Sequence, residues 1–164
     1  MSEQTARTAQ MLKVSKTLPK DLAKQYKILT KAMSNPKIDL SSAPTFSLEG
    51  ITCIGLCVKV YDGDTAHFVV DFNSVWTKFK CRMYGYNTAE IRGGTPETKA
   101  RAQVEKKYLE SLILNKLVEV QFGKFDKYGR PLATVIVPEK RLDVNKEMVL
   151  SGHAREYYGK GEKI

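Results

Sequence analysis

The chain has 164 residues and a mass of 18.5 kDa, a size that fits one modest domain and an extension. No run of residues approaches the roughly 20 apolar side chains of a membrane-spanning helix, and residues 1–20 lack the apolar segment of a secretory signal. The net charge of +9 favours a polyanionic partner, with a lysine-rich surface kept for solubility as the alternative.

Residues 1–46 are predicted to form a basic extension, with eight Lys and Arg against three Asp and Glu. Residues 2–16 are polar and lack a hydrophobic period, so we expect them to be disordered. Residues 18–34 carry apolar side chains at helical spacing. This pattern predicts one helix, which docks on the domain or on a partner. Its apolar stripe consists of Leu22, Tyr26, Leu29 and Met33.

From Phe46 onward the apolar side chains alternate with a period of two, which is typical of β-strands. Three successive strands are predicted at residues 51–60, 66–72 and 75–86. Asp62-Gly63 and Asn73-Ser74 separate these strands and are typical of tight turns. The three strands should therefore form an antiparallel meander.

A helix is predicted to begin at Thr95, which is a good cap residue and is followed by proline. Two strands are expected at residues 117–122 and 131–137, and a short helix at 145–150. The apolar stripe of the long helix is predicted to consist of Ala100, Val104, Tyr108 and Leu112, with Leu109 and Ile113 beside it.

Three strands, a helix, two strands and a final helix follow the order of an OB-fold. The predicted fold class is therefore α+β, a five-stranded OB-fold β-barrel with packed helices over residues 47–160. The basic extension with its one helix precedes this domain.

Three cysteines, Cys53, Cys57 and Cys81, lie in strand-like surroundings. Their odd number and the missing signal argue against a disulfide framework. His67 and His153 are isolated in the sequence, so a zinc site lacks a second pair of ligands. We expect buried free thiols and an intracellular protein, cytoplasmic by default with the nucleus left open.

Three short segments carry side chains that suit phosphodiester chemistry. The first, Asp62-Gly63-Asp64-Thr65, adds a second carboxylate after a turn, where a hard cation can bind. Asp-Gly alone is equally typical of a hairpin turn. The third segment, Asp126-Lys127-Tyr128-Gly129-Arg130, offers two cations for phosphates and a ring for a sugar or base, unless it is only a solvated turn.

The second segment runs from Arg82 to Glu90. Strand alternation turns Arg82 away from Cys81 and Met83, and a guanidinium fork matches a phosphate well. A weak surface salt bridge is the alternative. Glu90 follows an irregular stretch, where a carboxylate beside a cation can orient or deprotonate a water molecule.

Taken together, these segments resemble the staphylococcal nuclease (thermonuclease-like) family over residues 52–158. The resemblance rests on the Asp-Gly-Asp-Thr turn, the Arg-x4-[Asp/Asn]-Thr-x-Glu stretch and the Asp-Lys-Tyr-Gly-Arg loop. Val144-Asn145 and Gly152-His153-Ala154 resemble the family's C-terminal helix and exit. The resemblance implies an OB-type barrel and calcium-dependent cleavage of DNA and RNA at the 5′ P–O bond, which leaves 3′-phosphates.

The resemblance also implies roles for individual residues. The catalytic residues would be Arg82, Glu90 and Arg130, with Glu90 as general base and the arginines on the scissile phosphate. The calcium ligands would be Asp64, Asn87 and the carbonyl of Thr88, with Asp62 behind them. The neighbouring phosphate and base would be held by Lys127, Tyr128 and Tyr158.

Asn87 departs from the family pattern, which has an aspartate ligand at this position. An amide oxygen can bind calcium but brings no negative charge, so we expect weaker cation affinity and a possible change of divalent cation. Ala89 stands where proline is common in the family, which should loosen the loop entropically.

The sequence predicts a calcium-dependent nuclease of low sequence specificity, active on DNA and RNA that are single-stranded or locally open. We expect a monomer without membrane association. The alternative is a catalytically weakened OB-fold module that binds nucleic acid or a protein partner, and Asn87 is the feature that favours it. Retention of Asp64, Arg82, Glu90 and Arg130 favours the enzyme.

Overall fold

The computed structural model describes residues 3–159, and the chain divides into two compact units, Met1–Phe46 and Ser47–Ile164. No helix within residues 3–159 is long and apolar enough to cross a membrane.

The first unit contains helices α1 (Glu3–Ser15) and α2 (Lys20–Met33) and the short 3-10 helix η1 (Leu40–Ser42). The helix predicted over residues 18–34 is α2. Residues 3–15 form α1, where the lack of a hydrophobic period predicted disorder. Alanine, glutamine, methionine and lysine give this segment a high helix propensity. It packs on α2, and Ser15 of α1 and Thr30 of α2 are buried.

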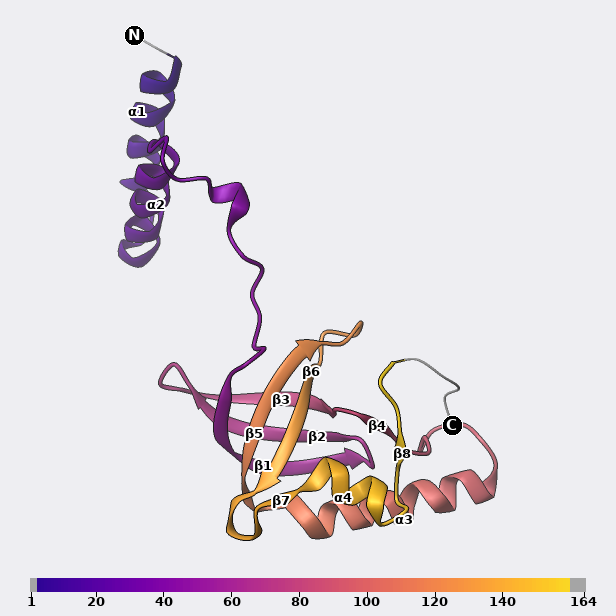
Figure 1. The fold of residues 1–164 in the computed structure, drawn as a ribbon. Coiled ribbons are helices and arrows are strands. Elements are labelled where there is room, and N and C mark those ends of the chain that lie inside the picture. The colour runs from indigo at the N-terminus through magenta and orange to yellow at the C-terminus, as the bar shows by residue number, and fades with distance from the viewer. Residues whose placement is uncertain (1–2, 160–164) are drawn as a thin grey trace. The chain divides into compact units, whose positions relative to one another are not determined.

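The second unit is built on a sheet that closes into a barrel (Figure 1). Its strands are β1 (Thr52–Asp62), β2 (Thr65–Phe72), β3 (Val75–Met83), β5 (Leu117–Phe125), β6 (Pro131–Val137) and β7 (Leu142–Asp143). The strand order is β3-β2-β1-β5-β6-β7, and β3 also pairs with β6, in parallel. This last pairing closes the barrel, and the predicted OB-fold is confirmed, with β7 as an additional strand.

Alternate side chains of the strands fill the barrel. The core includes Phe68 and Val70 of β2, Met83 of β3, Val120 of β5 and Val135 of β6, all at most 2% exposed. This alternation is the period of two that the sequence shows. The side chains between them point outward, and on β3 these are Lys78, Lys80 and Arg82.

Helix α3 (Pro96–Ile113) begins as predicted, since the side chain of Thr95 accepts a hydrogen bond from the Thr98 N–H. Its predicted apolar stripe is partly wrong: Tyr108 and Leu112 pack against the core, but Ala100 is exposed. The buried residues of α3 are Ala102, Glu105, Leu109 and Ile113, whereas Val104 is 57% exposed. The prediction missed the buried stripe because this stripe includes Glu105, and the hydrophobic pattern assigned that glutamate to the surface.

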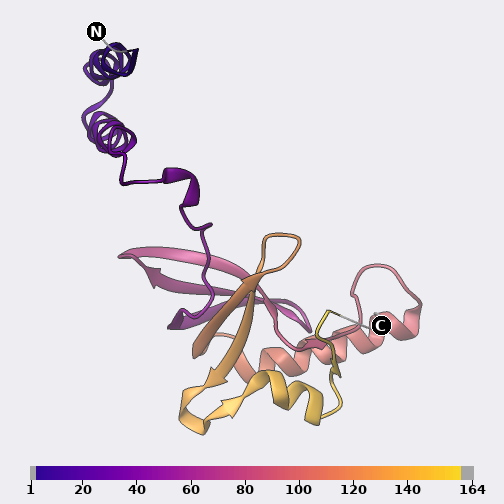
Figure 2. The same cartoon turned by 45° about the horizontal axis from the view of Figure 1, so that its top comes forward.

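The C-terminal part packs on this helix and returns to the barrel rim. After the 3-10 helix η2 (Pro138–Lys140), helix α4 (Val144–Leu150) contacts α3, and Figure 2 shows the two helices side by side beneath the barrel. Strand β8 (Arg155–Glu156) then pairs with β4 (Tyr86–Asn87). This pairing ties the C-terminal segment to the loop that follows β3.

The three cysteines are free, as predicted. Cys57 and Cys81 are fully buried, whereas Cys53 is half-buried. Burial raises the pKa of the Cys57 thiol to about 11. Burial, with a smaller effect of the other two cysteines, raises the pKa of Cys81 to about 12.

Candidate active site

Strand pairing brings the three sequence segments to one rim of the barrel. Asp62 pairs with Thr65 at the β1–β2 turn, and Thr65 pairs with Arg82 across β2 and β3. Arg82 also pairs with Leu132 of β6, two residues after Arg130. The closure of the barrel therefore places both arginines beside the acidic turn.

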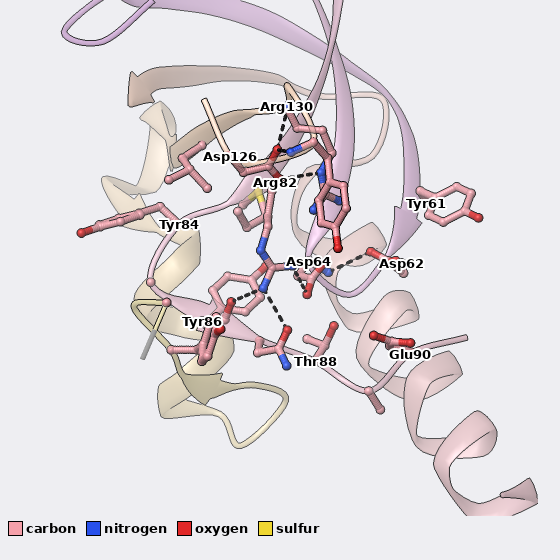
Figure 3. Close-up of a pocket in the computed structure, with 18 of the residues that line it drawn as sticks. Tyr61, Asp62, Asp64, Arg82, Tyr84, Tyr86, Thr88, Glu90, Asp126 and Arg130 are labelled. Carbon is pink, nitrogen blue, oxygen red and sulfur yellow. Dashed lines mark hydrogen bonds and ion pairs between the residues drawn. The ribbon is translucent and has the colours of Figure 1, made fainter. Parts of the chain in front are cut away.

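A cavity of about 610 Å³ lies between these segments (Figure 3). All ten residues singled out from the sequence line it: Asp62, Asp64, Arg82, Asn87, Thr88, Glu90, Lys127, Tyr128, Arg130 and Tyr158. Three tyrosines that were not predicted from the sequence line the same cavity: Tyr61, Tyr84 and Tyr86.

The guanidinium of Arg82 joins the acidic turn to the loop after β3. Its Nη1 lies 2.6 Å from Oδ2 of Asp64 in a partly buried ion pair. Its Nη2 donates to Oδ1 of Asn87 at 2.9 Å and to the carbonyl of Tyr86 at 3.2 Å. One side chain thus holds two of the proposed cation ligands.

Arg130 is fixed from the other side of the cavity. Its Nε donates to Oδ2 of Asp126 at 2.8 Å, and its Nη1 donates to the hydroxyl of Thr65 at 3.2 Å. Burial alone would raise the pKa of Asp126, but hydrogen bonds from Arg130 and from the Tyr128 N–H outweigh this effect and lower it. Arg130 is therefore paired with a charged carboxylate and held in place.

Tyr128 is 67% exposed and lies close to two cations. The Nζ of Lys127 is 5.0 Å from the centre of its ring, and Cζ of Arg130 is 5.6 Å from the same point. The ring keeps a solvent-accessible surface that a sugar or base can cover.

A close backbone contact holds the acidic turn against the loop that carries Thr88 and Glu90. A Cβ atom at Gly63 would lie 2.8–2.9 Å from side-chain atoms of Thr88, so a larger residue would push Thr88 away. The buried hydroxyl of Tyr86 donates to the carbonyl of Gly63 at 2.9 Å. Burial raises the pKa of Tyr86 well above its ordinary value, so this donor keeps its proton.

The N–H of Ala89 has a buried acceptor that the sequence did not predict. It donates to Oε2 of Glu105 at 2.7 Å, and Oε1 of the same carboxylate accepts from Nε of Arg101 at 2.7 Å. Glu105 is 2% exposed and Ala89 is 1% exposed. Proline at this position would have no N–H. Ala89 has a buried N–H that requires a hydrogen-bond acceptor, and Glu105 provides it. The loop is thus anchored to α3 and not simply loosened.

Tyr158 closes the C-terminal side of the cavity. Its ring packs edge-on against Tyr84, with 5.5 Å between the ring centres. Gly85 has φ +84°, and a Cβ atom there would lie 3.1 Å from the Tyr158 ring. Gly85 therefore gives both the turn and the room that this tyrosine pair needs.

The donors around Asp64 fit a hard cation. Asp62, Asp64, Asn87 and Thr88 all line the cavity, and they can offer two carboxylates, an amide oxygen and a backbone carbonyl, all oxygen donors as calcium prefers. Within residues 3–159, no three Asp, Glu, His or Cys side chains are grouped to hold a metal ion. A cation here would therefore depend on neutral oxygens as well as on the carboxylates.

These features define an α+β protein of the OB-fold class with carboxylates and guanidiniums gathered at one rim of its barrel. The family described as staphylococcal nuclease homologue matches residues 80–163. The chain belongs to this family. The matched range includes Arg82, Glu90 and Arg130 and begins after the Asp62–Thr65 turn. A comparison with curated proteins finds no match.

The Ala89–Glu105 hydrogen bond predicts that one substitution restores stability lost through another. In Glu105→Leu, the Ala89 N–H is buried without an acceptor, which should lower the free energy of unfolding by about 1–3 kcal/mol. Ala89→Pro removes that N–H, so the double variant should regain much of the loss. Urea unfolding of the wild type, both single variants and the double variant measures this. A double variant no more stable than Glu105→Leu would contradict the proposed pairing.

The pKa of Asp62 predicts that the stability of the metal-free protein depends on pH. Burial, and then the charge of Asp64, raise the pKa of Asp62 to about 6. A carboxyl group whose pKa is higher in the folded than in the unfolded state stabilises the fold below about pH 4, and this contribution is lost as the pH rises through 6. Relative to wild type, Asp62→Asn should therefore gain stability between pH 4.5 and pH 7.

Urea unfolding with a chelator present, at both pH values, measures this difference. Asp71→Asn, an exposed carboxylate on β2, is the matched control. An Asp62→Asn difference that is the same at both pH values would show that Asp62 has an ordinary pKa.

Proposed function

We propose that the chain is a metal-dependent nuclease that hydrolyses phosphodiester bonds of DNA and RNA with little sequence specificity. The observation that carries this proposal is that two guanidiniums and a carboxylate line one cavity, and that this carboxylate has no charged partner within residues 3–159. These are Arg82, Arg130 and Glu90. Membership of the staphylococcal nuclease homologue family supports the same activity.

The two arginines keep donors for a phosphate. A guanidinium carries five N–H groups. Among the residues that the structure describes, Arg82 uses three of them on Asp64, Asn87 and the Tyr86 carbonyl, and Arg130 uses two on Asp126 and Thr65. The remaining N–H groups can bind the scissile phosphate. Because the protein contacts fix both side chains, they can stabilise the charge that builds on the phosphate oxygens in the transition state.

Glu90 is the proposed general base. It is exposed, and Figure 3 shows it on the side of the cavity that also holds Asp62 and Thr88. In this role Glu90 takes a proton from a water molecule whose oxygen attacks the phosphorus. The 5′ P–O bond breaks, and the leaving oxygen takes a proton from solvent. The products carry a 3′-phosphate and a 5′-hydroxyl.

Calcium is the proposed cofactor, and when bound it would supply positive charge beside the phosphate. Asp64, the amide oxygen of Asn87 and the carbonyl of Thr88 would hold it, with Asp62 behind Asp64. The amide at position 87 brings no charge, which predicts a lower affinity and greater tolerance of other divalent cations.

The substrate would be bound by its backbone and by stacking. Lys127 offers a cation for the neighbouring phosphate, and Tyr128 and Tyr158 are both more than 60% exposed at the cavity. Aromatic rings accept the face of any base, so this arrangement gives little sequence preference. Stacking requires an accessible base face, which favours single-stranded or locally open nucleic acid.

Glu90→Gln tests the catalytic proposal. It should reduce calcium-dependent cleavage of single-stranded DNA by about 10²–10⁴-fold, since general base catalysis is lost while binding groups remain. Glu139→Gln, an exposed glutamate outside the cavity, is the control and should cleave normally. If the wild type binds the DNA but calcium yields no products, the chain is the binding module that was the alternative.

Asn87→Asp tests the cation proposal. The added charge should lower the calcium concentration that gives half-maximal cleavage, by roughly tenfold. Asn87→Ala, which removes the oxygen, should raise it. Cleavage rates measured across a calcium titration compare the three proteins. Equal calcium dependence in wild type and Asn87→Asp would exclude this residue as a ligand.

A further inference from the structure

A row of lysines lies on the outer face of the barrel, next to the cavity along the strands. On β3, Arg82, Lys80 and Lys78 alternate with core residues and share the outer face. Successive members are two residues apart, about 6.6 Å along the strand. Trp76, two residues further, is 79% exposed. These four side chains, Arg82, Lys80, Lys78 and Trp76, form a line that starts at the cavity, and we call it the β3 track.

The neighbouring strands add to this surface. His67 of β2 pairs with Lys80 on one side and with Lys59 of β1 on the other, and the three strands lie side by side in Figure 1. Burial, and then the charges of Lys59, Lys80 and Lys78, lower the pKa of His67. The positive charge of this face therefore comes mainly from the lysines.

Tyr61 connects the cavity to these lysines. It lines the cavity, and its ring lies 5.0 Å from Nζ of Lys80 and 5.9 Å from Nζ of Lys59. In Figure 3, Tyr61 and Tyr84 lie on opposite sides of the cavity. A strand that leaves the cavity on the Tyr61 side meets the lysines next.

The lysines of this face have no carboxylate partner among residues 3–159. Lys106 and Lys146 each pair with a carboxylate, but none of the ion pairs in this part of the chain includes Lys59, Lys78 or Lys80. Three like charges held close together are unfavourable unless an anion binds between them. The face therefore suits a polyanion with regularly spaced charges.

We propose that the β3 track binds the backbone of single-stranded nucleic acid on one side of the cleavage site. Lys80 and Lys78 contact successive phosphates after the one held by Arg82, and Trp76 stacks on a base at the far end. This inference rests on the proposed function for its ligand, because it extends the path of the same strand. It assigns a binding surface outside the cavity.

Trp76 supplies a direct readout, since it is the chain's single tryptophan. It lies six residues from Arg82, about 20 Å along the strand. With a chelator present to prevent cleavage, a 20-nucleotide thymidine oligonucleotide should quench the tryptophan fluorescence, whereas a thymidine dinucleotide should not. Binding of the 20-mer without any change in fluorescence would overturn the proposed path.

Lys78→Gln/Lys80→Gln tests the phosphate contacts, with Lys107→Gln/Lys140→Gln as a control of equal charge on exposed lysines elsewhere. Losing two phosphate contacts should lower the slope of log affinity against log salt by about 1.4 and weaken 20-mer binding roughly 20-fold at 0.1 M salt. Calcium-dependent cleavage of the dinucleotide should be unchanged. Equal losses in the control would show general attraction by charge, and unchanged affinity would show no contact. Either result overturns the proposal.

The outcomes separate this inference from the proposed function. If the wild type binds the 20-mer through the β3 track but never cleaves it, the nuclease proposal fails and the track stands. If the wild type cleaves both substrates and the lysine variant behaves like wild type, the track fails and the nuclease proposal stands. If the wild type does not bind the 20-mer at low salt, both fail.

Discussion

Arg82 donates to Asp64, Asn87 and the Tyr86 carbonyl, and through these bonds strand β3 holds the acidic turn and the following loop in one arrangement. The side chains of Arg82 and Asp64 are only 17% and 9% exposed. Removing one partner would leave the other charge poorly solvated, at a cost of about 3–5 kcal/mol for a fully buried pair. The arrangement of the residues around the cavity therefore depends on the Arg82–Asp64 ion pair.

Barrel closure explains why residues far apart in the chain meet. The parallel pairing of β3 with β6 sets Arg82 beside Leu132, so the loop before β6 delivers Arg130 to the same rim. The β4–β8 pairing brings Tyr158 from the other direction. The site is therefore a product of strand register. A slip of one residue on β3 would turn Arg82 into the core and Cys81 toward the cavity.

The sequence was most informative where a pattern repeats or a motif is long. Alternating side chains predicted the strands. The three segments predicted nine residues of the cavity, and the family resemblance added Tyr158. Glu105 was missed because its role depends on the N–H of Ala89, sixteen positions away in the chain. The hydroxyl of Tyr86 was missed for the same reason, since its acceptor at Gly63 is distant. Helix α1 was missed because residues 2–16 lack a hydrophobic period, although several of them have a high helix propensity.

The buried thiols make the domain a reporter of its own unfolding. In the folded barrel, Cys57 and Cys81 are inaccessible, and their raised pKa values leave almost no thiolate at neutral pH. Thiolate is the form that reacts with alkylating reagents and oxidants. Modification at these two positions therefore requires opening of the barrel. Its rate gives access to rare openings that equilibrium unfolding does not resolve.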